Sequence, residues 1–238
     1  MKIIFLVAGS GSRLGSQSPK PLTLLSNGET LLGRQLSLLS KCSFFGDAPI
    51  TLVVGYKQEI YKQTYPNLLL AFNSKYESSN TAKSLLVGIG ESEDEDVLWF
   101  NGDLFYDESI VDNVSAAISG GENIVFYKSN PFLLDEEAMK LKFARSSSKT
   151  NVIAVSKDLS QSSLEAIGIN FVTASSLRDF KGVLQSVSDD SYFESAINRA
   201  VQQKMIEFRA QSVGSGFITE IDFQSDLAEV EKYLKNNS

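Results

Sequence analysis

The chain contains no histidine among its 238 residues. This absence excludes Ser-His-Asp and Cys-His catalysis and every metal site that depends on an imidazole ligand. Cys42 is the single cysteine, so the chain cannot form an internal disulfide or a cysteine-based metal site. A metal ion bound here has to be a hard cation held by oxygen ligands, and Mg²⁺ is the first expectation.

Basic residues are also few, with 22 Lys and Arg against 29 Asp and Glu and a net charge of −7 at pH 7. An acidic balance argues against nucleic acid or an anionic membrane as a partner. The N-terminal apolar run is too short for a signal peptide, and no later segment approaches the length of a membrane span. We therefore expect a cytoplasmic protein with no nucleic-acid and no membrane partner, and the sequence leaves its oligomeric state open.

What the chain does have is a strand that runs into a glycine-rich loop. Residues 3–7 form an apolar run suited to a buried strand, and glycines alternate with serines in the residues that follow. Glycines let backbone N–H groups approach phosphate oxygens, and Arg13 and Lys20 add positive charge. The pattern indicates a polyphosphate site. Its predicted ligands are Ala8, Gly9, Ser10, Gly11, Ser12, Arg13 and Lys20.

This loop departs from two common phosphate-binding motifs. No Gly-x-x-x-x-Gly-Lys-Ser/Thr run is present, and Gly-x-Gly-x-x-Gly is missed because Gly15 follows Gly11 by four residues. What fits is Gly-x-Gly-x-Arg followed by Pro19-Lys20-Pro21. This pattern resembles the opening motif of nucleotidyltransferases, which join a nucleoside triphosphate to a phosphorylated small molecule. The alternative is an ordinary Gly/Ser surface loop, which the Arg and Pro-Lys spacing disfavours.

Strand and helix patterns alternate through the first half of the chain, which predicts a mostly parallel sheet with right-handed crossovers. Strands are expected at 50–54, 68–72, 97–101 and 123–127, and helices at 29–39, 56–65, 80–88 and 108–119. The second half predicts a hairpin from 139–144 and 151–155, strands at 167–172 and 216–221, and helices at 175–187, 191–204 and from about 225. We predict an α/β fold: a single Rossmann-like domain over residues 1–238, with a twisted, mixed, mostly parallel sheet flanked by helices.

Three carboxylates are the candidate metal ligands. Asp103 follows an apolar strand, and Gly102 permits a turn that can aim its side chain into the crevice above the sheet. Its alternative role is to cap the next helix, for which Asp107 is better placed. Glu220 and Asp222 point to the same side if residues 216–221 continue as a strand, so both can grip one cation. Together they predict a Mg²⁺ site.

The Gly-Asp turn and the late Glu-x-Asp resemble the metal ligands of the bacterial phosphocholine and 2-aminoethylphosphonate cytidylyltransferase group. Membership implies a GT-A-like nucleotidyltransferase fold and transfer of CMP from CTP, with Mg²⁺, to a small phosphorylated or phosphonate acceptor in headgroup or cell-surface polysaccharide biosynthesis. Asn80 and Ser84 resemble the Asn-x-x-x-Ser-Leu helix start that this group places near the nucleotide. Gly102 is assigned to the same nucleotide site. Lys157, in Ser-Lys-Asp-Leu, matches a lysine near the acceptor phosphate.

In the reaction that this resemblance implies, Arg13 holds the β- and γ-phosphates, Lys20 stabilises charge at the α-phosphate, and Lys157 guides the acceptor. The identity of the acceptor stays open. A quaternary ammonium would require aromatic rings around it. The candidate rings are Phe105, Tyr106, Phe171, Tyr192 and Phe193, although aromatic residues are more often core.

Three other functions remain in competition. A sugar-1-phosphate nucleotidyltransferase would share the loop and the carboxylates. A nucleotide-sugar glycosyltransferase also places carboxylates after a strand, but it usually shows Asp-x-Asp there, whereas here Asp107 follows Asp103 by four residues. A non-catalytic nucleotide-binding subunit is disfavoured because Arg13, Lys20 and the carboxylates are present together.

Overall fold

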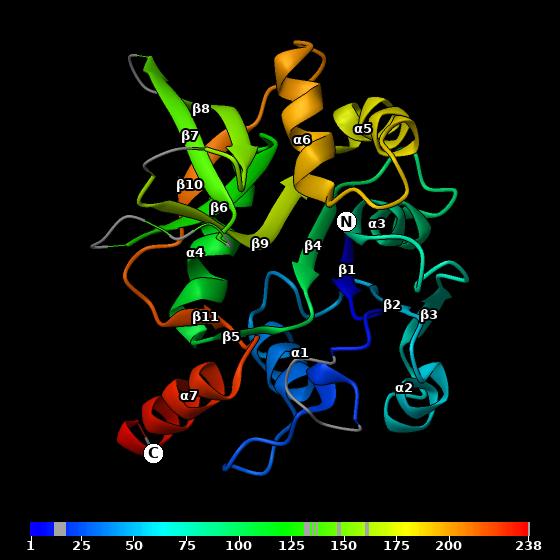
Figure 1. The fold of residues 1–238 in the computed structure, drawn as a ribbon, viewed down its shortest axis with the longest axis vertical. Coiled ribbons are helices and arrows are strands. Elements are labelled where there is room, and N and C mark those ends of the chain that lie inside the picture. The colour runs from blue at the N-terminus through cyan, green and yellow to red at the C-terminus, as the bar shows by residue number, and fades with distance from the viewer. Residues whose placement is uncertain are drawn as a thin grey trace.

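The computed structural model describes residues 1–11, 18–130, 134, 136, 138–146, 149–159 and 162–237. Within these residues, nine strands form one sheet in the order β3-β2-β1-β4-β9-β6-β10-β8-β7, and β5 and β11 form a second, two-stranded sheet. Figure 1 shows β1 and β4 in the middle of the molecule, with β7 and β8 toward one edge and β3 toward the other.

The strands and helices have the following bounds. The strands are β1 (Lys2–Leu6), β2 (Ile50–Val54), β3 (Leu69–Phe72), β4 (Val97–Asn101), β5 (Leu104–Tyr106), β6 (Ile124–Ser129), β7 (Lys140–Ser146), β8 (Lys149–Ser156), β9 (Leu164–Val172), β10 (Arg209–Ser212) and β11 (Ile218–Glu220). The helices are the 3₁₀ turn η2 (Lys20–Leu22) and α1 (Leu31–Lys41), α2 (Gln58–Thr64), α3 (Thr81–Ile89), α4 (Glu108–Ile118), α5 (Ala174–Ser186), α6 (Phe193–Gln202) and α7 (Gln224–Asn236).

The first four strands of the large sheet pair in parallel, as their alternation with helices predicts. β1 pairs with β2 and β4, and β2 pairs with β3. The bounds of β2 and β4 are the predicted ones, because both are short apolar runs buried on both faces of the sheet. The α/β fold class is confirmed.

The antiparallel part of the sheet is larger than strand–helix alternation predicts. β9 lies between β4 and β6 and runs antiparallel to both, and β7 and β8 form the expected hairpin. Two strands were not predicted from sequence patterns. β5 has only three residues, and β10 has the sequence Arg-Ala-Gln-Ser with one buried position. β10 gains its strand conformation from parallel pairing with β6 rather than from its own alternation.

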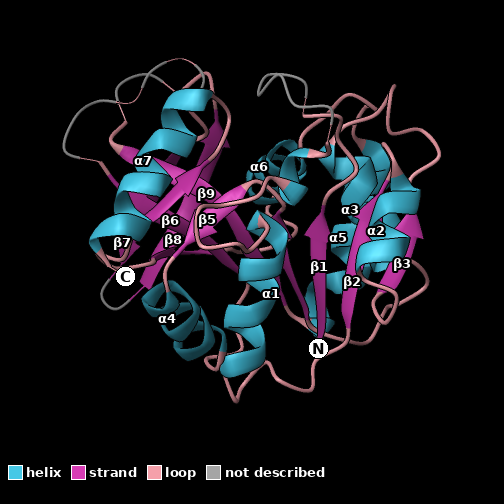
Figure 2. Cartoon of the chain, turned by 90° about the horizontal axis from the view of Figure 1, so that it is seen from below, coloured by secondary structure: helices cyan, strands magenta, loops and turns pink. Residues whose placement is uncertain are grey.

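Helices cover both faces of the sheet. Side chains of α3, α5 and α6 join one apolar cluster, and those of α1, α2 and α4 join another on the opposite face. Trp99 of β4 anchors the first cluster, with its ring centroid 5.7 Å from that of Phe180 and 5.6 Å from that of Phe193. Helix α7 packs separately through Val230 and Leu234, and Figure 2 shows it at the side of the molecule away from β1–β3.

In the part of the chain that the structure describes, every helix falls short of the length and apolarity that crossing a membrane requires. The assignment of residues 1–238 to a single domain stays a prediction.

Candidate functional site

The site begins where β1 and β4 end side by side, with Leu6 paired to Asn101. The backbone N–H of Gly102 donates to the carbonyl oxygen of Leu6 across 3.1 Å. A Cβ atom on Gly102 would lie 2.5 Å from Cγ1 of Val7, so glycine is required for the chain to pass this closely. The next residue, Asp103, therefore leaves the sheet at the carboxyl ends of parallel strands, where open α/β sheets bind ligands.

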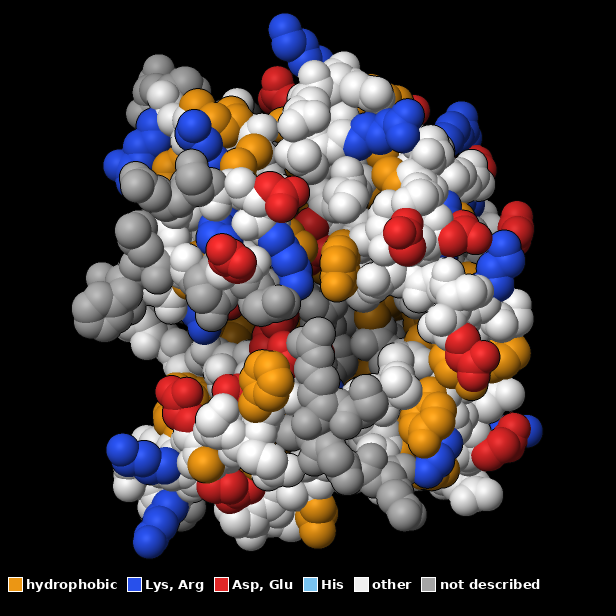
Figure 3. Space-filling model, in the orientation of Figure 1, with side chains coloured by type: hydrophobic (Ala, Val, Ile, Leu, Met, Phe, Trp, Pro, Cys, Tyr) orange, Lys and Arg blue, Asp and Glu red, His pale blue; other side chains and the backbone are white. Residues whose placement is uncertain are grey.

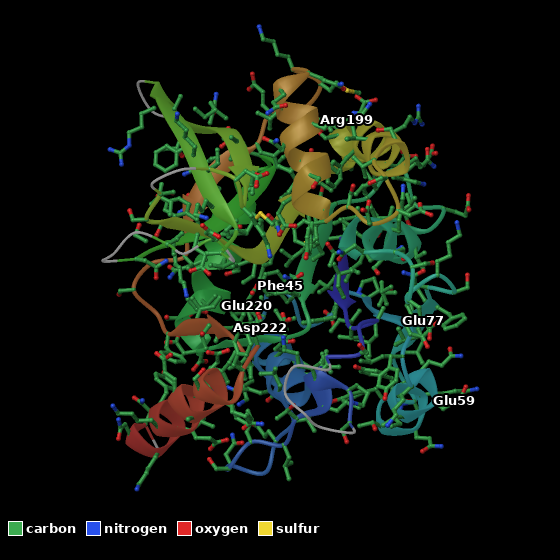
Figure 4. The ribbon with its side chains drawn as sticks, viewed as in Figure 1. Phe45, Glu59, Glu77, Arg199, Glu220 and Asp222 are labelled. Atoms are coloured by element: carbon green, nitrogen blue, oxygen red, sulfur yellow. The ribbon has the colours of Figure 1, made fainter. Side chains whose placement is uncertain are left out.

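The small β5–β11 sheet brings the C-terminal part of the chain to the same place. The N–H of Ile221 donates to the carbonyl oxygen of Asp103 across 2.9 Å, and Nδ2 of Asn101 lies 3.5 Å from Oε1 of Glu220. Figure 4 shows Glu220 and Asp222 next to each other beside β11, near the end of β4. Asp222 lies beyond the strand, which ends at Glu220, so a shared strand face is not what places them together.

Lys20 joins the two acidic segments. Its ammonium nitrogen lies 2.9 Å from Oδ2 of Asp103 and 2.5 Å from Oδ1 of Asp222, and its side chain is 10% exposed. Burial lowers the pKa of Lys20, but the charges of Asp103 and Asp222 and their hydrogen bonds outweigh burial, so the pKa lies above its usual value. Lys20 is therefore a buried cation clamped between two predicted metal ligands.

The carboxylates suit a hard cation in their chemistry. Burial, followed by repulsion from Asp103 and Asp222, raises the pKa of Glu220 to about 8, and a bound cation would relieve that repulsion. Oδ1 of Asp103 is buried and has no hydrogen-bond partner among the described residues. Among those residues, however, no group of three or more acidic, His or Cys side chains is close enough to hold a metal as it stands.

A cavity of about 300 Å³ extends from these carboxylates. Figure 3 shows acidic side chains at a hollow in the middle of this face of the molecule. Its lining comes from β1, β4, β9, α3, α6, the β8–β9 connection and the segment around Glu220. The lining residues used below are Gly9, Thr81, Asp103, Lys157, Glu165, Tyr192, Glu194, Glu220 and Asp222.

The structure brings some of the predicted loop ligands to this cavity. Gly9 lines it, and the buried Ala8 accepts the N–H of Tyr56 through its carbonyl oxygen. Gly11 has a φ of 60°, and a Cβ atom there would lie 2.5 Å from Cβ of Lys20. Ser10 is exposed. Ser12 and Arg13 lie outside the described residues, so their assignment stays a prediction.

The two residues predicted at the start of α3 do not line the cavity. Asn80 caps the helix, with Oδ1 accepting the N–H of Thr81 across 2.8 Å. Ser84 is buried and accepts a hydrogen bond of 3.0 Å from Nδ2 of Asn73. Thr81, one residue along, lines the cavity in their place.

Of the predicted acceptor-side residues, Lys157 and Tyr192 meet in the cavity wall. The Lys157 ammonium lies 5.3 Å from the centroid of the Tyr192 ring, which is 40% exposed. Phe193 also lines the cavity, although it is fully buried against Trp99. The remaining aromatic candidates, Phe105, Tyr106 and Phe171, are core residues.

Sequence reasoning missed Glu194, which lines the cavity from the first turn of α6 and is 5% exposed. Burial raises its pKa to about 7, while its own backbone N–H and the Lys157 charge lower it. A signal for it exists: Glu194 lies three residues before Ile197 and so falls on the apolar face of α6. An acidic residue at such a position is almost never fully buried unless it is paired.

The sheet order, the strand-end loop and the carboxylates define a nucleotidyltransferase type of α/β protein. The family model of the MobA-like NTP transferase domain matches residues 3–150. The chain belongs to this family, within the nucleotidyltransferase superfamily. No curated protein matches it in sequence.

Solved structures with the same fold cover nearly the whole chain. The inositol-1-phosphate CTP transferase from T. maritima is 21% identical, with a TM-score of 0.77, over 97% of this chain and 93% of that one. The CTP:phosphocholine cytidylyltransferase from Streptococcus pneumoniae is 19% identical, with a TM-score of 0.76, over 98% of each chain. A UDP-glucose pyrophosphorylase complexed with UDP-glucose is 13% identical, with a TM-score of 0.75, over 100% and 99%.

Proposed function

We propose that this nucleotidyltransferase is a cytidylyltransferase, which transfers CMP from CTP to a small phosphorylated or phosphonate acceptor and releases pyrophosphate. The observation that carries the proposal is the Lys20 ammonium between Asp103 and Asp222 at the head of a cavity. This arrangement supplies a cation for an α-phosphate next to carboxylates suited to a metal. The choice of CTP is supported by the two CTP-using enzymes among the solved structures of the same fold.

The chemistry needs little proton transfer, because an acceptor phosphate is already anionic at neutral pH. One of its oxygens attacks the α-phosphorus of CTP, the bond from that phosphorus to the bridging oxygen breaks, and pyrophosphate leaves with the electron pair. The work of the protein is then to position the two anions and to neutralise their charge. We assign Lys20 to the α-phosphate, the backbone N–H groups of residues 9–13 with Arg13 to the β- and γ-phosphates, and Lys157 to the acceptor.

Asp103, Glu220 and Asp222 would hold Mg²⁺, whose chemistry is to neutralise phosphate charge. In the protein without the ion, Lys20 supplies the positive charge between two of these carboxylates. When the nucleotide binds, the same lysine contacts its α-phosphate. Lys20 is thus held by the two carboxylates close to the position where its charge is needed.

A screen of pyrophosphate release tests the proposal. Each of the four NTPs is incubated with Mg²⁺ and with phosphocholine, aminoethylphosphonate, a polyol phosphate or a sugar 1-phosphate, and the products are identified by mass spectrometry. We expect CTP to give a CDP-linked or CMP-linked product. A preference for UTP with a sugar 1-phosphate would replace the proposal with a sugar-1-phosphate nucleotidyltransferase. Separate incubations with nucleotide sugars test the glycosyltransferase alternative, which predicts release of a nucleoside diphosphate.

A further inference from the structure

Two lysines are buried among the described residues, Lys20 and Lys140. The charge of Lys20 is matched by two carboxylates. Lys140, the first residue of β7, is 4% exposed and forms no salt bridge with another described residue; its ammonium instead donates to the carbonyl oxygen of Lys157 across 2.8 Å. A buried ammonium without a paired carboxylate is costly, and a leucine would fill the same strand position without that cost.

Lys140 lies where three strands come together beside the cavity. It pairs with Ser156 of β8 on one side and with Glu165 of β9 on the other. The Glu165 carboxylate is engaged elsewhere, because it lies 3.3 Å from the ammonium of Lys128 and accepts from Nδ2 of Asn130 across 3.0 Å. Lys140 is not one of the residues that line the cavity. Its charge therefore acts from behind the cavity wall.

The carbonyl that Lys140 holds belongs to the turn that directly follows β8. On one side, the turn is closed by Ser156, whose hydroxyl oxygen accepts the N–H of Asp158 across 3.1 Å. On the buried side, the Lys140 ammonium fixes the carbonyl of Lys157, and a hydrogen bond from a charged donor is stronger than one from a neutral donor. The backbone of Lys157 is thus held by two hydrogen bonds, which set the direction in which its side chain leaves the chain.

The Lys157 side chain extends from this fixed backbone into the cavity wall. Its ammonium lies 5.3 Å from the centroid of the Tyr192 ring, and both residues line the cavity. A lysine side chain is long and has many rotamers, so the position of its ammonium depends strongly on the backbone from which it starts. Fixing that backbone keeps the Lys157 ammonium in one region of the cavity.

We propose that Lys140 is a positioning residue, whose ammonium fixes the Lys157 carbonyl and so places the Lys157 ammonium where an acceptor phosphate binds. The proposal rests on the proposed function, which assigns Lys157 to the acceptor, and it adds a residue that touches neither substrate. Removal of the Lys140 ammonium frees the turn, so the Lys157 side chain samples more positions and meets the acceptor phosphate less often in the right geometry.

NMR tests the positioning step without any substrate. In protein labelled with ¹³C at Cε of lysine, the Lys157 signal is identified by its loss in Lys157→Arg, and Tyr192→Leu shows how far the ring shifts it. Lys140→Met keeps the apolar part of the buried side chain and removes its ammonium, so the Lys157 signal should move most of the way toward its position in Tyr192→Leu. Lys142→Met is the matched control, because Lys142 is an exposed lysine of the same strand, and it should leave the signal in place.

Kinetics test whether this position matters for the acceptor. Pyrophosphate release from CTP with Mg²⁺ is measured with phosphocholine, aminoethylphosphonate, a polyol phosphate and a sugar 1-phosphate. For each acceptor that is used, Lys140→Met should raise the acceptor KM by about tenfold, a size typical of residues that orient a ligand from outside the site, and leave the KM for CTP unchanged. In the Lys157→Met background the same substitution should have no further effect, because Lys140 acts through Lys157.

The outcomes separate this proposal from the proposed function. If the Lys157 signal stays in place in Lys140→Met, if the acceptor KM does not change, or if the losses of the two single variants multiply in the double variant, Lys140 does not act through Lys157 and the transferase assignment stands. If the signal moves as expected but no NTP releases pyrophosphate with any of the four acceptors, Lys140 positions Lys157 and the proposed reaction is wrong. If the signal stays in place and no pyrophosphate is released, both proposals are wrong.

Discussion

The Lys20 ammonium lies 2.9 Å from Oδ2 of Asp103, which joins two residues that are 83 positions apart in the chain. The contact depends on two glycines at which the backbone packs closely. Gly11 packs against Lys20, and Gly102 packs against the chain at the end of β1. A lysine predicted to bind phosphate thus contacts a carboxylate predicted to bind metal. If Lys20 binds phosphate and Asp103 binds metal, as proposed, cation and nucleotide binding are coupled through one side chain.

Replacing Lys20 with methionine should therefore reduce transfer while the fold is retained. Methionine keeps much of the length of the buried side chain but removes its charge. By comparison with other preorganised charge-stabilising groups, kcat should fall by about 10²–10³. Lys75→Met is the matched control, because Lys75 forms an exposed ion pair with Asp189 and its side chain is 68% exposed. Equal loss in both variants, or none in Lys20→Met, would contradict the role of Lys20.

Divalent-cation binding in the absence of nucleotide should respond in opposite directions to two substitutions. Lys20→Met removes the competing ammonium, so Mn²⁺ should bind more tightly than in wild type. Asp103→Asn removes a ligand charge, and affinity should fall by at least about tenfold, the loss seen even for partners outside the ligand shell. Mn²⁺ electron paramagnetic resonance measures the free ion directly. Asp112→Asn, on the exposed side of α4, is the control. Weaker binding in Lys20→Met would show that the lysine does not compete with the metal.

The turn before Asp103 should tolerate no side chain at residue 102. In Gly102→Ala the new Cβ meets Cγ1 of Val7 at 2.5 Å and the Leu6 carbonyl oxygen at 2.9 Å, so backbone has to shift. Overpacking of this kind costs about 1–3 kcal/mol and would move Asp103 with it. Gly182→Ala provides the contrast: that position is exposed within α5 with nothing within 4 Å, and alanine there should stabilise the helix by up to about 1 kcal/mol. Urea unfolding of both variants measures the difference.

Local patterns predicted the parallel half of the sheet because β1, β2 and β4 are apolar runs whose character does not depend on their partners. β10 and β5 were not predicted, because their strand conformation comes from pairing with distant segments, and such pairing leaves little signal in the local sequence. The same limit applies to the site. Lys20, Asp103, Glu220 and Asp222 were predicted from short motifs, whereas Glu194 was missed because its importance depends on which face of α6 borders the cavity.

Glu194 should make the folded protein less stable as pH rises. An ordinary salt-bridged acid has the opposite effect, because its pKa is lowered on folding. Burial raises the pKa of Glu194 from 4.5, the ordinary value for glutamate, to about 7 in the folded protein. The folded state therefore binds more protons between these values, and the free energy of unfolding contributed by this group falls as pH rises from about 4.5 to 7. Lys157 attracts the carboxylate and opposes the shift. Glu220 borders the same cavity, but its own pKa of about 8 keeps it mostly protonated over this pH range.

Comparison with Glu194→Gln isolates this contribution, because glutamine cannot titrate. The variant should match wild type near pH 4.5 and be more stable at pH 8, by an amount on the order of 3 kcal/mol for a shift of this size. Thermal unfolding across this pH range, with Glu59→Gln as the control, measures the difference. A wild-type curve parallel to that of Glu194→Gln at all pH values would mean that Glu194 is paired or solvated in the folded protein.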